Sequence, residues 1–352
     1  MKRRNTGIDL LRIIAMYFII VGHILDHGGI LSVLLTKEAR SVGLISSIIA
    51  RPAVDCYALI TGWGGYKEDN PKLRLTNRTR YKRYFRYWLQ VVSIGVGLII
   101  FQSTISGAFD GKRIIKYLLP VTHKAYWYFS AYTITFFVSP FLNEFVKRQN
   151  KIAESFFIAF IIMFGFFAET FPNGTLFAKA FRVVWIVALY CIGCIIKKTE
   201  RNENNHTLIR LIVACFVTAV LGALFLDPLI CSILPSYNSW FSGFFSPVIL
   251  IIGILTVSLF STSNSILLHS KEKLIEMVSM ATFGIYIIHE NDAFREWFIN
   301  DHFRWLGDLN WVFLFPSILL FAGLVFLLSM MIEYSRINVV SKIRNCQKTH
   351  KR

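Results

Sequence analysis

Two ionisable side chains, Arg12 and His23, lie in one apolar stretch near the start of the chain. Eleven residues of α-helix make about three turns, so both side chains share one helix face, about 16 Å apart along the axis. Ionisable groups inside a bilayer are costly and usually face a bundle interior or a water-filled cavity, where they have a function. A guanidinium can hold an anionic group, and an imidazole can take a proton near neutral pH. The pair therefore predicts a site that runs through a membrane.

A third polar residue, Asp9, precedes Arg12 by three positions, so the two can pair on one helix face at the cytoplasmic end of this span. The alternative is that Arg12 reaches to the lipid headgroups and His23 simply lies at the outer interface. The shared helix face favours a functional pair, in which Arg12 holds a polar or anionic group and His23 acts as a base.

The composition indicates a membrane protein. Of 352 residues, 55% are hydrophobic and only 17% are charged, which is too apolar for a soluble protein of this length. No signal-peptide pattern precedes a polar domain, so we expect the first span to be retained. The net charge of +17 would suggest nucleic-acid binding in a soluble protein, but these charges lie in short loops between apolar runs. No nucleic-acid partner is expected.

The fold class predicted from the apolar runs is an all-α, polytopic membrane bundle of about ten helices. The runs are centred near Tyr17, Val54, Gly95, Phe136, Met163, Val187, Phe216, Ile249, Ile285 and Phe321. Basic residues concentrate in one set of loops, above all in the run from Lys67 to Arg86, which places both termini in the cytoplasm. We expect one membrane domain over residues 1–340, followed by a basic cytoplasmic tail over 341–352.

Other polar residues have structural explanations. Asp55 follows Arg51 by four positions, which predicts a salt bridge within one helix. Cys191 and Cys194 have no second ligand pair nearby in sequence, so we interpret them as packing residues and predict no metal site. An aromatic belt at the bilayer interface is the expectation for Tyr126, Trp127 and Tyr128.

The stretch from Asp9-Leu10-Leu11-Arg12 to Gly22-His23 resembles the first helix of the integral-membrane acyltransferase family 3, whose members O-acylate sugars and other cell-surface molecules. Three further blocks occur in the family's order. They are Val54-Asp55-Cys56-Tyr57-Ala58-Leu59-Ile60-Thr61-Gly62, Arg80-Tyr81-Lys82-Arg83-Tyr84-Phe85-Arg86-Tyr87-Trp88 and Thr282-Phe283-Gly284-Ile285-Tyr286-Ile287-Ile288-His289-Glu290-Asn291. The resemblance covers essentially the whole chain.

The resemblance implies transfer of an acyl group, most often acetyl, from a cytoplasmic acyl-CoA such as acetyl-CoA to a cell-surface or lipid-linked glycan. We expect His23 to act as the base, aided by Arg12 and Asp9, or to carry a transient acyl group. Arg83 and Arg86 are expected to bind the phosphates of the donor, with Arg12 holding the donor further along, although any cytoplasmic loop should be basic. His289, Glu290 and Tyr286 are expected to contact the acceptor.

The implied location is the plasma membrane of a bacterium, with exopolysaccharide as one possible acceptor. The alternative function is a transporter or flippase for a glycan, with Asp9, Arg12, Asp55 and His23 along its path. Transporters often show related halves, and the sequence has no such symmetry.

Overall fold

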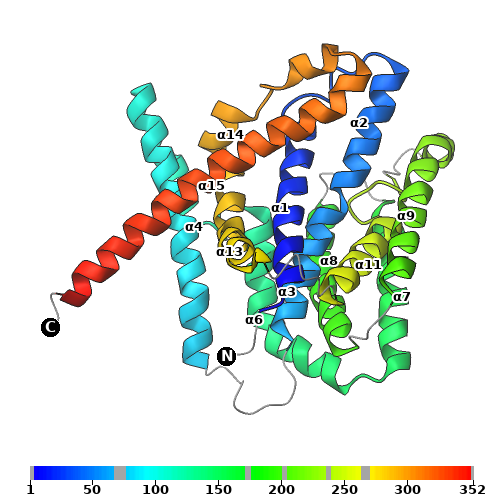
Figure 1. Cartoon of the computed structure of the whole chain (residues 1–352), viewed down its shortest axis with the longest axis horizontal. Coiled ribbons are helices and arrows are strands. Elements are labelled where there is room, and N and C mark those ends of the chain that lie inside the picture. The colour runs from blue at the N-terminus through cyan, green and yellow to red at the C-terminus, as the bar shows by residue number, and fades with distance from the viewer. Residues whose placement is uncertain are drawn as a thin grey trace.

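The structure is a computed structural model that describes residues 4–66, 77–170, 176–199, 204–234, 239–262 and 270–349. Every long element in the described part of the chain is a helix (Figure 1). The helices are α1 (Thr6–Asp26), α2 (Lys37–Ala50), α3 (Pro52–Gly65), α4 (Asn77–Ser106), α5 (Gly111–Leu118), α6 (Trp127–Arg148), α7 (Lys151–Ala168), α8 (Leu176–Lys198), α9 (Asn205–Leu221), α10 (Asp227–Ile233), α11 (Pro247–Thr262), α13 (Glu272–His289), α14 (Asp292–Phe298) and α15 (Trp311–Thr349).

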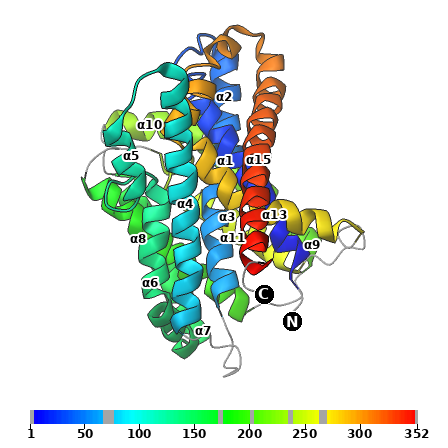
Figure 2. The ribbon, with the colours of Figure 1, turned by 90° about the vertical axis from the view of Figure 1, so that its left-hand side faces the viewer.

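Seven segments within the described residues are long and apolar enough to cross a membrane: 6–26, 37–65, 79–106, 151–168, 179–198, 205–233 and 311–342. Each of the ten predicted span centres falls in a different helix, including the shorter apolar helix α11. The all-α membrane bundle is confirmed. The count of ten and the cytoplasmic side of the termini stay predictions, although both ends of the chain point to the same end of the bundle (Figures 1 and 2).

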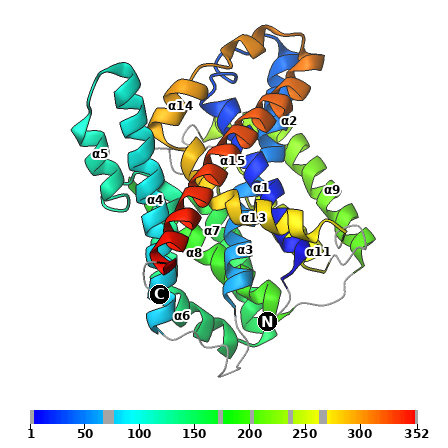
Figure 3. The same ribbon diagram turned by 60° about the vertical axis from the view of Figure 1, so that its left-hand side comes forward.

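Helix α1 forms the centre of the bundle. The side chain of Asn5 caps its start by accepting a hydrogen bond from the Ile8 N–H at 3.0 Å. The apolar residues from Leu11 to Leu25 include many that are fully buried, because α3, α13, α15 and α2 pack around the helix. Figure 3 shows α15 crossing in front of α1 and α13. The polar residues of α1 therefore face protein.

Helices α2 and α3 meet at Arg51. Pro52 is the first residue of α3, where its missing N–H and fixed φ are tolerated, and the Arg51 N–H still bonds to the Ser47 carbonyl at 3.0 Å. The sequence analysis placed only one span here, centred on Val54, and did not predict α2 as a separate element.

Two glycines bring α3 and α8 into backbone contact. A Cβ at Gly62 would meet the Tyr190 carbonyl, and one at Gly193 would meet the Leu59 carbonyl and the Trp63 N–H. Small residues at a membrane helix interface allow this close approach. Helix α8 is thereby fixed against α3.

Helix α4 is held to the bundle by a buried carboxylate. Glu333 on α15 is 1% exposed and accepts hydrogen bonds from Gln90 on α4 at 2.9 Å and from Arg336 at 2.6 Å. Because a carboxylate buried in this position would be costly without partners, the three side chains fix α4 against α15.

Candidate functional site

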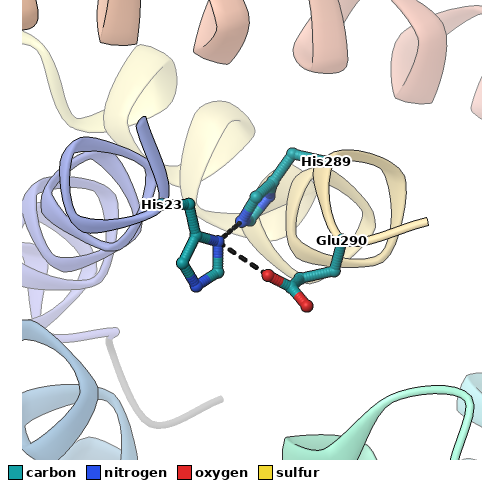
Figure 4. Close-up of side chains that lie close together, drawn as sticks. All are labelled: His23, His289 and Glu290. Carbon is teal, nitrogen blue, oxygen red and sulfur yellow. Dashed lines mark hydrogen bonds and ion pairs between the residues drawn. The ribbon is translucent and has the colours of Figure 1, made fainter. Parts of the chain in front are cut away.

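Three side chains meet where α1 and α13 end: His23, His289 and Glu290 (Figure 4). The Nδ1 atom of His23 lies 3.1 Å from Nε2 of His289 and 2.7 Å from Oε1 of Glu290. His289 is fully buried, Glu290 is 9% exposed, and the His23 side chain is 21% exposed. The sequence placed His23 and His289 at the same end of the bundle, and the structure brings them into contact.

The hydrogen bonds of this cluster fix the proton positions. Nδ1 of His289 lies 2.8 Å from the Ile285 carbonyl, which only accepts, so this nitrogen carries the proton and the neutral ring presents a lone pair at Nε2. Nδ1 of His23 then faces two acceptors, this lone pair and the Glu290 carboxylate. It must be the donor, which assigns the lone pair of neutral His23 to Nε2. His23 is thus arranged as a base.

Further ionisable side chains surround the cluster. Nη1 of Arg295 lies 4.0 Å from Oε2 of Glu290, and the His27 ring lies 5.3 Å from the ring of His23. Burial lowers the pKa of His27 below its usual value, and the positive charge of Arg295 lowers it further. Burial would raise the pKa of Glu290, but His23, His289 and Arg295 outweigh this effect and hold it below the usual range.

At the other end of α1, Asp9 forms the centre of a second polar cluster. The Asp9 carboxylate accepts from Arg12 at 2.9 Å, from Arg4 at 2.7 Å and from the Ser279 hydroxyl at 2.8 Å. Arg12 also donates to Ser279 at 3.1 Å. The predicted Asp9–Arg12 pair is present. Arg4 and Ser279, which the sequence analysis did not single out, complete it.

A polar and aromatic stripe on α13 connects the two clusters. Ser279, Thr282, Tyr286 and His289 recur every three or four residues, so they share one helix face. Ser279 bonds to the Asp9 cluster, Thr282 bonds to the Tyr57 hydroxyl at 3.1 Å, and the Tyr286 ring lies 6.0 Å from the ring of His289. The stripe therefore faces α1 near Arg12, α3 at Tyr57 and α6 at Tyr128. The 3.6-residue period of the stripe was visible in the sequence, but the sequence did not show which helices the stripe faces.

The predicted donor residues lie apart from this axis, on α4. Arg86 lines an open pocket of about 510 Å³ together with Tyr81, Lys82 and Phe85. Arg83 is on the same helix but does not line this pocket. The basic run from Lys67 falls partly on residues 67–76, which lie outside the described residues. Arg83 and Arg86 are helical and belong to the first turns of α4.

Two expectations about other polar residues are wrong. Asp55 forms no salt bridge with Arg51; its Oδ1 accepts from the Trp185 indole on α8 at 3.0 Å. Tyr126 and Tyr128 do not form an interfacial belt, since they are 1% and 8% exposed and pack inside the bundle. In both cases the partner comes from a helix distant in sequence, which local spacing does not reveal.

The cluster of His23, His289 and Glu290 could also hold a metal ion. One ligand atom from each of His23, His289 and Glu290 lies within 4.8 Å of the others, and nitrogen and carboxylate ligands suit Zn²⁺. Cys191 and Cys194 are buried and unpaired with each other, in keeping with a packing role. The Cys194 sulfur contacts the Gly62 carbonyl at 3.3 Å.

Comparison with known proteins adds one finding. The model of a family described as an acyltransferase domain, acyltransferase family 3, matches residues 5–334. The match includes the His23 cluster, the α13 stripe, the α4 pocket and all of the Asp9 cluster except Arg4. No curated protein and no solved structure is significantly similar to the chain.

Proposed function

Since the chain belongs to acyltransferase family 3, we propose that this membrane acyltransferase transfers an acyl group from acyl-CoA, with acetyl-CoA as the donor, to a hydroxyl of a cell-surface or lipid-linked glycan. The observation that carries the proposal is the His23–Glu290–His289 cluster, in which His23 has a free lone pair at Nε2 and a carboxylate behind it. This arrangement suits general-base activation of a hydroxyl.

In the proposed reaction, Nε2 of His23 takes the proton of the acceptor hydroxyl. The acceptor oxygen attacks the thioester carbonyl, a C–O bond forms, and the C–S bond breaks. Coenzyme A leaves as a thiolate and takes the proton from the His23 imidazolium. Glu290 stabilises the imidazolium in the meantime by accepting from Nδ1.

The donor would enter at the end of the bundle that holds the Asp9 cluster. Cationic and aromatic side chains in the α4 pocket suit the phosphates and the adenine of coenzyme A. Arg12 would hold a polar part of the donor arm, and the α13 stripe offers polar groups from Arg12 to His23. In this proposal the protein sits in a bacterial plasma membrane with both termini in the cytoplasm, and the acceptor is an extracytoplasmic glycan such as an exopolysaccharide.

Mass spectrometry of surface glycan tests the function directly. Cells that carry the protein should add the mass of one acyl group to a glycan, and cells with His23→Ala should not. Loss of a general base lowers the rate by about a hundredfold to ten-thousandfold. The matched control is His302→Ala, at an exposed histidine outside the cluster. An unchanged glycan in all cells, or full modification with His23→Ala, would contradict the proposal.

A further inference from the structure

Two arginines lie near each other beside the outer cluster. Arg51 directly follows Ala50, and a Cβ added to Gly22, the neighbour of His23, would lie 3.8 Å from the Ala50 Cβ. Arg182 on α8 places its guanidinium 6.0 Å from the Trp127 ring and 5.4 Å from the Phe244 ring. Asp55, one turn after Arg51, accepts from the indole of Trp185, which lies about one turn after Arg182, so the two arginines lie at matching levels of α3 and α8. Helices α2, α3 and α8 thus bring two cations together inside the bundle.

Neither cation has a carboxylate partner among the described residues. The buried Nε of Arg51 makes no hydrogen bond, and Asp55, its predicted partner, binds Trp185 instead. Among the described residues no ion pair joins Glu169 to Arg182, and Oε1 of Glu169 accepts from the Phe245 N–H. Two unpaired guanidiniums inside a membrane protein are costly, and such charges generally serve a ligand.

A row of aromatic rings joins these cations to the proposed base. The rings of Trp127 and Tyr128 are 5.6 Å apart, those of Tyr128 and Tyr286 are 5.9 Å apart, and the row continues to His289 and His23. Tyr128 and Tyr286 are 8% and 6% exposed, so these rings pack against one another inside the bundle. The row therefore holds the Arg182 cation and the proposed base at its two ends.

We propose that Arg51 and Arg182 form a subsite for an oxyanion carried by the acceptor, so that the enzyme modifies an acidic glycan rather than a neutral one. This inference rests on the proposed function for the identity of the acceptor. The oxyanion is a carboxylate of the sugar or a phosphate that links the sugar to a lipid. The guanidinium fork binds both groups through paired N–H donors.

Binding of small sugars to the purified protein in nanodiscs tests the subsite without acyl transfer. The probes are glucuronic acid, glucose 1-phosphate and glucose, followed by saturation-transfer NMR. We expect one or both charged sugars to bind about tenfold or more tightly than glucose, because a guanidinium forms stronger hydrogen bonds with an anionic group than with a neutral hydroxyl. Preference for glucuronic acid would identify a carboxylate, and preference for glucose 1-phosphate would identify a phosphate.

Variants separate this subsite from the reaction. Arg51→Gln and Arg182→Gln should remove the preference for charged sugars, whereas Arg51→Lys and Arg182→Lys should retain part of it. Arg304→Gln, at an exposed arginine paired with Asp301, is the control and should change nothing. His23→Ala should lose transfer but keep the preference for charged sugars over glucose. This preference would remain even if the proposed function were wrong. Equal or undetectable binding of all three sugars, or an unchanged preference in both Gln variants, would overturn the subsite.

Discussion

At the scale of single residues, the central feature is that one proton of His23 faces two acceptors. The carboxylate of Glu290 and the lone pair of His289 both point at Nδ1 of His23, so the opposite nitrogen is left free for chemistry. Glu290 touches no reacting atom in this scheme. It acts through His23, as a positioning residue that also stabilises the imidazolium.

Substitution of Glu290 by Gln tests that role. The amide oxygen can still accept from Nδ1 but has no charge, so we expect kcat to fall by about tenfold or more, a part of the full contribution of a general base. The acidic limb of the kcat–pH profile should move to lower pH because the imidazolium is less stabilised, and the KM for the acceptor should stay the same. Glu290→Asp should recover part of the rate. A variant with a normal profile and less folded protein would mean that Glu290 is only structural.

At the scale of elements, close helix contacts decide where the polar residues lie. Gly193 is the clearest case, because its Cα faces the Leu59 carbonyl and the Trp63 N–H of α3. Gly193→Ala should force α3 and α8 apart and destabilise the protein by about 1–3 kcal/mol. The control is Gly97→Ala on α4, where a Cβ meets nothing within 4 Å and helix propensity improves. The test compares the melting temperatures of the two variants in detergent. An equal decrease for both variants, or no decrease for either, would contradict the proposed contact.

A second element-scale contact ties α5 to α14, the short helix that follows His289 and Glu290. Nη2 of Arg113 donates to Oε1 of Glu296 at 2.6 Å, and this bond, together with the Arg113 charge, lowers the pKa of Glu296 below its usual 4.5. The pair stabilises the folded state above about pH 4.5, and this stabilisation disappears as pH falls through the lowered pKa. Because both side chains are partly exposed, it should amount to no more than about 1 kcal/mol.

Thermal unfolding in detergent from neutral pH to about pH 3 measures this contribution. The wild-type protein should lose slightly more stability on acidification than Glu296→Gln, which has no carboxylate to protonate. Asp308→Asn is the control at another acidic residue of the outer side. Identical pH curves for the wild type and Glu296→Gln would exclude a stabilising pair.

The sequence predicted how residues on the same helix lie relative to one another. It did not predict contacts between residues on different helices. The relation of Asp9, Arg12 and His23 was predictable because all three lie on α1 at helical spacing. The contact between His23 and His289 joins residues 266 positions apart, and local periodicity does not encode which helices pack together. For the same reason Asp55 was assigned to Arg51, a neighbour in sequence, although its partner is Trp185 on α8.

At the scale of the whole molecule, the two polar clusters lie at opposite ends of α1 and α13. The Asp9 cluster lies at the end of the bundle that also holds Arg4, whereas the His23 cluster lies beside α14 and the segment that precedes α15. Both helices are needed to connect the clusters, and α13 provides polar side chains along the whole distance. The fold therefore suits a reaction whose two substrates come from opposite faces of the membrane.

Proteoliposomes of known orientation test this arrangement. Labelled acetyl-CoA supplied only to the face that bears the termini should label a glycan acceptor confined to the other face, because the acyl group would pass along α13 from Arg12 to His23. His23→Ala in the same vesicles should abolish the label, and His302→Ala should not, which separates transfer from leakage of either substrate. A transporter would move the glycan unmodified and consume no thioester. Labelling only when both substrates share one compartment would overturn passage of the acyl group through the bundle, while the acyltransferase activity itself would stand.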